Sequence, residues 1–241
     1  MKETFRWVSA HLEKEVQLVR WGESGSPVLL FPTAGGDAEE VERFNLIKAL
    51  EPLTNAGKIK VYSTDSIAGK AWISGQHSGK YCSRLQNLFD AVVYNEIVPL
   101  IRADCNSDDI EIITAGASIG AFNAMASVCR HPDAFRLAIG MSGTYDLTKY
   151  LDGQFNQEFY FCSPLQFLPG LEGQILEQLQ ERMIVMPCGQ GDYEDIGESW
   201  RLAKTLGEKG IPNRVEPWGA EWHHNWVTWR EMLPRYLSEH A

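Results

Sequence analysis

A serine between two glycines is the first candidate for chemistry in this sequence. The segment Gly116-Ala117-Ser118-Ile119-Gly120 matches the pattern G-x-S-x-G. It follows the apolar run IEIITA and opens a segment of helical periodicity, which is the strand-turn-helix setting in which such a serine is exposed as a nucleophile. Glycines two positions to either side relieve the crowding at a strained turn. Because chance can supply so short a pattern, the assignment of Ser118 depends on partners elsewhere in the chain.

The first partner is a base, since a serine hydroxyl is a poor nucleophile until its proton is removed. Of the six histidines, His223 and His224 alone follow a strand-like run, VEPW, and directly precede the last predicted helix. His224 is nearer the helix start, where a loop residue can reach over the edge of a sheet, and is the favoured base. His223 would then support the base or line the pocket. A surface loop position is the competing interpretation for both.

The second partner is an acid that orients the imidazole and stabilises its charged form. Asp192, in MIVMPCGQGDYED, follows a predicted buried strand and two glycines, where the acid of the order Ser, Asp, His should fall. Asp195 is a rival that is better suited to cap the next helix, and Asp146, after LAIGMSG, is a second rival. The prediction is a triad of Ser118, Asp192 and His224.

Two backbone N–H groups are expected to bind the oxyanion that this chemistry forms. One belongs to Ile119, at the start of the helix after the serine, where partial positive charge favours an anion. The other is assigned to Ala34 or Gly35, in the turn FPTAGGD after the first buried strand. An ordinary strand-to-helix turn is the competing interpretation.

Aromatic residues are candidates for the walls of an acyl pocket. Trp72, Trp222 and His223 are the residues considered, although tryptophan is as common in a core. The segment 145–171 is rich in aromatic residues, contains two prolines and fits the alternation of strands and helices least well. Such a connection is often a lid or binding loop. Rings that simply cover the sheet are an equal alternative.

The elements that must position these residues alternate along the chain. Segments 4–10 and 15–21 predict an antiparallel hairpin. From Val28 onward the apolar runs VLLF, IKVYS, IEIITA, LAIGMS and MIVMP alternate with helical periodicity near 40–51, 84–102, 119–131, 196–209 and 226–239. Unbroken apolar runs between helices indicate a parallel sheet buried on both faces. Right-handed crossovers then give an α/β fold, a three-layer α/β/α sandwich with a mostly parallel sheet and an N-terminal antiparallel hairpin, in one domain over 1–241.

Charge and cysteine content argue against several classes of protein. The formal net charge is -10 and the basic residues are scattered, so a nucleic acid partner is not expected. Residues 1–15 lack the apolar stretch of an export signal, and no apolar run is long enough for a membrane span. Five cysteines without a C-x-x-C spacing argue against a disulfide framework or a zinc site and favour a cytoplasmic location. The oligomeric state is left open, a homo-oligomer included.

In combination the motifs resemble those of the bacterial putative esterases of the α/β-hydrolase superfamily, akin to the esterase D and antigen 85 type. The residues concerned are FPTAGGD, GASIGAFNA, SGTYDL, GQGDYED and HHNWVTWREMLP, in this order from about Val28 to Leu237. His224 matches the histidine of the family, and Asn225 stands where aspartate is common.

The resemblance implies an α/β-hydrolase fold and hydrolysis of a small-molecule carboxylic ester, with no cofactor and no metal ion. Ser118, Asp192 and His224 would act through an acyl-enzyme intermediate. Some members of the family transfer the acyl group to an alcohol or sugar, so an acyltransferase with the same triad is the second hypothesis. A non-catalytic binding protein on this fold is the third.

Overall fold

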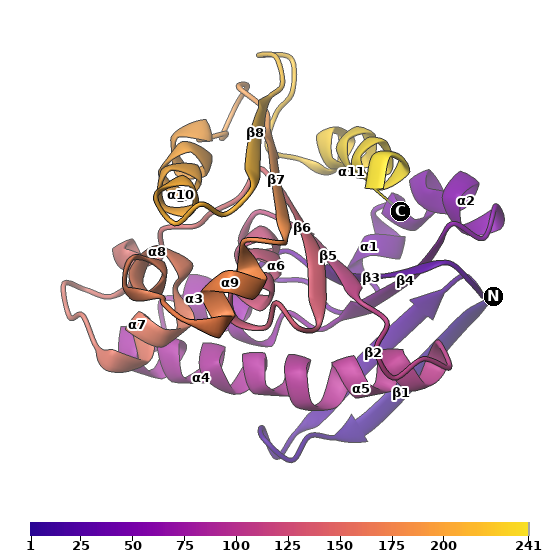
Figure 1. The fold of residues 1–241 in the computed structure, drawn as a ribbon, viewed down its shortest axis with the longest axis horizontal. Helices are drawn as coiled ribbons and strands as arrows, with labels where there is room; N and C mark the ends of the chain where they lie inside the picture. The colour runs from indigo at the N-terminus through magenta and orange to yellow at the C-terminus, as the bar shows by residue number, and fades with distance from the viewer. Residues whose placement is uncertain (241) are drawn as a thin grey trace.

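One mixed β-sheet runs through the computed structural model, which describes residues 1–240 (Figure 1). Its strands lie in the order β1-β2-β4-β3-β5-β6-β7-β8. They are β1 (Lys2–Val8), β2 (Glu15–Trp21), β3 (Ser26–Phe31), β4 (Ile59–Thr64), β5 (Ile112–Ala117), β6 (Phe135–Met141), β7 (Met183–Cys188) and β8 (Asn213–Pro217). The β1-β2 and β2-β4 pairs are antiparallel, and all other neighbours are parallel. The predicted hairpin and the mostly parallel sheet are confirmed.

Helices cover both faces of the sheet (Figure 1). Helices α1 (Glu40–Arg43), α2 (Leu46–Asn55) and α11 (Trp226–His240) lie on one face, and α4 (Gly79–Val92), α5 (Val98–Asp104), α6 (Ile119–Arg130) and α10 (Ile196–Glu208) lie on the other. Strand β3 shows why, because Leu29 and Phe31 pack into one apolar cluster while Val28 and Leu30 pack into the other. A strand with apolar side chains on both faces needs a helical layer on each side. The three-layer α/β-hydrolase arrangement is therefore confirmed.

Two predicted helices are interrupted in the structure. The helix expected over 84–102 consists of α4, a π-helical turn (Val93–Ile97) and α5. Pro99 has no N–H to donate to the preceding turn and its ring crowds the carbonyl of residue 95, which accounts for the wider turn. The helix expected over 40–51 is divided into α1 and α2 at Asn45, whose φ is 61°. A helix that the sequence patterns did not predict, α3 (Ile67–Ser74), follows β4.

The segment 145–171 forms short helices rather than an irregular loop. They are α7 (Gln157–Cys162), α8 (Pro164–Phe167) and two 3-10 turns (Thr148–Tyr150 and Leu168–Gly170), and α9 (Gln174–Leu179) follows them. The local signals are an Asn156 side chain that caps α7 and a proline at the first position of α8. Tyr145 and Phe159 are buried, whereas Phe155 and Phe161 are about half exposed. Some rings of this segment thus complete the core and others face solvent.

Gly120 is a position where the packing of α6 on β3 leaves no space for a side chain. A Cβ there would lie 2.4 Å from the carbonyl oxygen of Phe31 and 2.7 Å from that of Pro32. Because both neighbours are backbone atoms, we expect Gly120→Ala to lower the free energy of unfolding by about 3 kcal/mol, measured by urea titration. Gly207→Ala in α10 is the control, since its Cβ would meet nothing within 4 Å. Equal stability of the two variants would contradict this account of the turn.

Residues 1–240 contain no helix with the length and apolar character needed to cross a membrane. Within the same residues there is no group of three or more His, Cys, Asp or Glu side chains arranged to hold a metal ion.

Candidate active site

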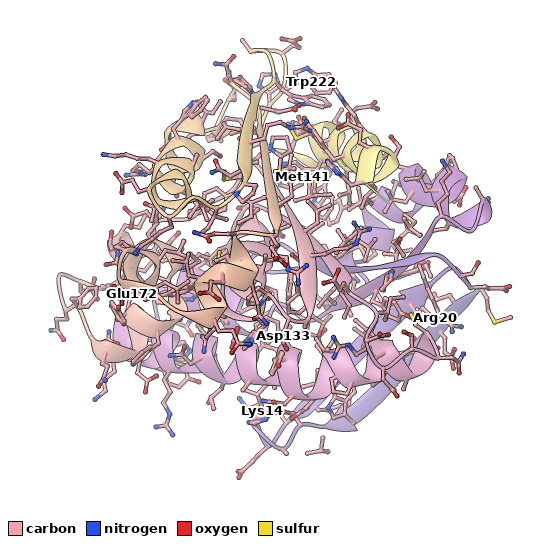
Figure 2. All side chains as sticks on the ribbon, in the orientation of Figure 1. Lys14, Arg20, Asp133, Met141, Glu172 and Trp222 are labelled. Carbon is pink, nitrogen blue, oxygen red and sulfur yellow. The ribbon has the colours of Figure 1, made fainter. Side chains whose placement is uncertain are left out.

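Ser118 lies at the carboxyl end of β5, in the middle of the sheet, and directly precedes α6. Its φ of 57° and ψ of -122° are unusual for a residue with a side chain. The Ser118 N–H donates to the Met141 carbonyl at 3.0 Å, and the Ser118 carbonyl accepts from the Thr144 N–H at 3.1 Å. Figure 2 shows Met141 near the centre of the molecule. These bonds hold a half-buried serine at the edge where the parallel strands end.

His224 lies on the loop between β8 and α11, which is fastened to the loop after β7. The N–H of His224 donates to the Asp192 carbonyl at 3.0 Å, and the N–H of Gly191 donates to the Trp222 carbonyl at 2.9 Å. The His224 side chain is 25% exposed. Its ring meets the Trp229 indole edge-on, with centroids 5.2 Å apart and planes at 87°. The imidazole is therefore held by packing and remains accessible from solvent.

Glu194 is the residue whose carboxylate faces His224. Its Oε2 is 3.5 Å from Nδ1 of His224, and its side chain is only 1% exposed. This distance is at the outer limit of a hydrogen bond, and such contacts in active sites are often long before substrate binds. A buried carboxylate beside Nδ1 can orient the ring and stabilise the imidazolium form.

Asp192 points elsewhere, contrary to the sequence-based expectation. Its carboxylate is 81% exposed and lies 3.5 Å from Nδ1 of His223. The N–H of Asp192 donates to that same Nδ1 at 2.8 Å. Since the nitrogen accepts there, it cannot also donate to the carboxylate. The structure brings the main chain of Asp192 to His224 but not its acidic group.

The turn between Asp192 and Glu194 explains the difference. Tyr193 has φ of 63° and is almost fully exposed, so the chain reverses direction at this residue. The backbone of Asp192 then faces the histidine loop while the side chain of Glu194 points inward. The segment GDYED contains three acidic residues, and their spacing alone does not tell which of them is buried.

Hydrogen bonds from two strand ends hold the Glu194 carboxylate. The Ser142 hydroxyl donates to Oε1 at 2.6 Å, and the Cys188 thiol donates to Oε2 at 3.3 Å. Burial, together with the nearby Glu194 charge, raises the pKa of Cys188, so that its sulfur keeps the proton it donates. Among residues 1–240 no lysine or arginine forms an ion pair with Glu194. A protonated His224 would therefore be its counter-charge.

The two rival aspartates have other roles. Asp195 caps α10, with its Oδ1 accepting from the Gly197 N–H at 3.0 Å, as the sequence predicts. Asp146 accepts from the Thr148 N–H at 3.0 Å and lies 3.6 Å from the Arg201 guanidinium. Within the described residues neither carboxylate forms a hydrogen bond or an ion pair with His224.

The turn after β3 is held by a buried glutamate that the sequence patterns did not single out. The Glu40 carboxylate accepts from both the N–H and the hydroxyl of Thr33, each at 2.7 Å. Ala34 packs against the apolar cluster that contains Ile119, and Gly35 is exposed. Within residues 1–240 the N–H groups of Ala34 and Gly35 have no backbone acceptor. Both groups therefore stay candidates for the expected anion-binding role.

The predicted pocket residues are in two separate clusters. Trp72 is buried in the apolar cluster of Ile119, and its Nε1–H donates to Gln86 Oε1 at 3.3 Å. Trp222 packs edge-on against Trp218, with ring centroids 4.8 Å apart. It lies at the upper rim of the molecule (Figure 2). His223 contacts Asp192, as described above. The structure therefore does not bring Trp72 and Trp222 together as one wall.

The chain matches the model of one protein family. The model of the family described as Putative esterase matches residues 54–240, most of the chain. The chain is a member of this esterase family. The resemblance of the sequence motifs to such esterases is thereby confirmed, and the matched residues of this esterase include Ser118, Glu194 and His224. No curated protein sequence matches the chain at a significant level.

Solved structures of esterases and hydrolases share the fold of this esterase. An S-formylglutathione hydrolase from Agrobacterium tumefaciens superposes with a TM-score of 0.76 at 13% identity, over 100% of this chain and 94% of that one. A ferulic acid esterase superposes with a TM-score of 0.75 at 15% identity, over 98% of this chain and 96% of that one. The fluorophosphonate-binding serine hydrolase F of Staphylococcus aureus superposes with a TM-score of 0.63 at 14% identity, over 99% of this chain and 97% of that one. At these identities the likeness establishes the α/β-hydrolase fold, while the substrate is a separate question.

Proposed function

We propose that this esterase cleaves carboxylic esters with Ser118 as nucleophile, His224 as base and Glu194 as the acid, in place of the Asp192 expected from the sequence. The observation that carries the proposal is the buried Glu194 carboxylate 3.5 Å from Nδ1 of His224. The strained backbone of Ser118 at the end of the central strand supports it. A carboxylate buried without a lysine or arginine partner is costly, and a neighbouring imidazole that gains a proton during the reaction offsets this cost.

The first half of the reaction acylates the serine. Nδ1 of His224 faces Glu194, so Nε2 is the nitrogen that takes the proton as Ser118 Oγ attacks the ester carbonyl. The N–H groups of Ile119 and of Ala34 or Gly35 stabilise the oxyanion. His224 then gives its proton to the departing alcohol, and the C–O bond to that alcohol breaks.

The second half releases the acid. His224 takes a proton from water, the water oxygen attacks the acyl carbonyl, and the returning proton frees Ser118 Oγ as the carboxylic acid leaves. Glu194 stays ionised throughout. If an alcohol replaces water in this half, the same residues catalyse acyl transfer. Product analysis with and without an added alcohol distinguishes the two reactions.

The buried apolar cluster that contains Ile119, the residue after the nucleophile, favours a small acyl group. Ile119, Trp72, Leu151 and Phe159 form one cluster, and each is at most a few percent exposed. Side chains packed in this way leave little volume for a long chain. The rings of the 145–171 segment would then bound the acyl site rather than open as a lid. A series of nitrophenyl esters from acetate to octanoate tests this, with turnover expected to fall as the acyl chain lengthens.

The two adjacent histidines should differ sharply on mutation. His224→Ala is expected to lower kcat for nitrophenyl acetate about 10³-fold or more, because the proton acceptor is lost. His223→Ala removes only the acceptor of the Asp192 N–H, so we expect a folded enzyme that keeps activity within about tenfold. Circular dichroism spectra check that both variants fold. The reverse order of activities would exchange the roles of the two residues.

A further inference from the structure

We infer that Ser142 and Trp229 are positioning residues, which hold the Glu194 carboxylate in the orientation that presents Oε2 to His224. The inference rests on the proposed function, because it concerns the same acid. A glutamate side chain has one more rotatable bond than an aspartate, so its carboxylate needs more contacts to be held in one place.

The backbone of Ser142 is held in place by its own contacts, independently of Glu194. It directly follows β6, and its N–H donates to the Pro187 carbonyl of β7 at 2.9 Å. Its φ of 48° lies in the left-handed region, which a serine adopts at some cost. The residue is buried, and its hydroxyl donates to Glu194 Oε1 at 2.6 Å. A strained serine with this contact connects the ends of two strands to the acid.

Trp229 determines the direction of that hydroxyl. Its Nε1–H donates to Ser142 Oγ at 3.1 Å, and both side chains are buried. An indole N–H can only donate, so the serine oxygen accepts there and keeps its own proton for Glu194. The same indole meets the His224 ring edge-on at 5.2 Å. One side chain of α11 therefore touches the base and, through Ser142, orients the acid.

The two oxygens of the Glu194 carboxylate accept hydrogen bonds from different elements of the fold. Ser142 of the β6 end binds Oε1, whereas Cys188 of β7 binds Oε2, the oxygen next to His224. With Oε1 held by Ser142, rotation of the carboxylate away from the imidazole breaks a hydrogen bond to a buried charge. Loss of this bond should impair proton transfer without affecting substrate binding.

Two conservative variants test these hydrogen bonds. Ser142→Ala removes the donor to Oε1, and Trp229→Phe keeps an aromatic ring against His224 while removing the N–H. For Ser142→Ala we expect kcat for nitrophenyl acetate to fall by about ten- to hundredfold, the range of one hydrogen bond to a charged group. Trp229→Phe removes a bond to a neutral hydroxyl, so its kcat should fall by about two- to tenfold. KM should stay within about twofold, since neither residue is proposed to touch substrate.

A double-mutant cycle separates positioning from a general structural role. In a Glu194→Gln background, Ser142→Ala and Trp229→Phe should cause little further loss of kcat, because the group through which they act is already neutral. Ser63→Ala and Trp21→Phe are matched controls in β4 and β2. Ser63 is fully buried, and Trp21 donates to a glutamate, Glu42, at 3.1 Å, as Trp229 does to a serine. Both controls should keep wild-type kcat.

The outcomes identify which proposal fails. A wild-type enzyme without ester turnover, and without labelling of Ser118 by a fluorophosphonate probe, would overturn the proposed function and the positioning role with it. An active wild type whose Ser142→Ala and Trp229→Phe variants keep kcat would overturn the positioning role alone. The positioning role would also be overturned if the two variants lost as much kcat in the Glu194→Gln background as in the native one, because the losses would then arise from packing. Losses confined to the native Glu194 background would support the inference.

Discussion

Ser118→Ala is expected to reduce the hydrolysis of nitrophenyl acetate to near the background rate, a loss in kcat on the order of 10⁵- to 10⁶-fold. Alanine retains the Cβ at the turn but has no oxygen to attack the carbonyl. Initial rates with the purified variant at high enzyme concentration measure the residual activity. Binding of a substrate analogue should persist, because the proposed oxyanion donors are backbone groups.

A second serine close in sequence provides the control for this experiment. Ser127 is buried in α6, nine residues after Ser118, and Ser127→Ala should fold and keep wild-type kcat. A fluorophosphonate probe should label wild type and Ser127→Ala on one peptide, the one containing Ser118, and leave Ser118→Ala unlabelled. Turnover of Ser118→Ala at the wild-type rate would show that the nucleophile lies elsewhere.

Glu194→Gln is expected to lower kcat by about 10³- to 10⁴-fold, whereas Asp192→Asn should change it by no more than a few fold. Glutamine has nearly the shape of glutamate but no charge to offset the imidazolium, and its amide can impose the wrong tautomer on His224. Asp192 keeps its backbone bond to His224 when its exposed carboxylate is neutralised. Steady-state kinetics of the two variants, with KM and kcat resolved, make the comparison.

Another buried glutamate shows whether the effect is specific. The Glu198 carboxylate accepts hydrogen bonds from the N–H groups of Tyr145 and Asp146, so Glu198→Gln should cost stability but spare kcat. Thermal unfolding measures the first effect and ester turnover the second. If Asp192→Asn were the inactive variant and Glu194→Gln the active one, Asp192 would be the acid and the 191–194 turn would have to rearrange when substrate binds.

Most of the fold and two of the three proposed catalytic residues are predictable from the sequence alone. Unbroken apolar runs between helical segments specify a sheet buried on both faces, because a strand reads this way only when helices cover both sides. The glycines at 116 and 120 marked Ser118, since the turn there cannot hold a Cβ on either side. His224 followed from its place between the last strand and the last helix. These features are local, and short-range pattern is enough to predict them.

The identity of the acid that faces the base depends on the three-dimensional fold. Asp192 and Glu194 are two residues apart in an irregular turn, where the direction of a side chain depends on the backbone angles of Tyr193 and not on a period of 2 or 3.6. The residues that hold Glu194 lie at the ends of β6 and β7, and Ser142 lies 52 positions earlier in the chain. A buried carboxylate is identified by the donors around it, and those donors become neighbours only when the sheet has formed.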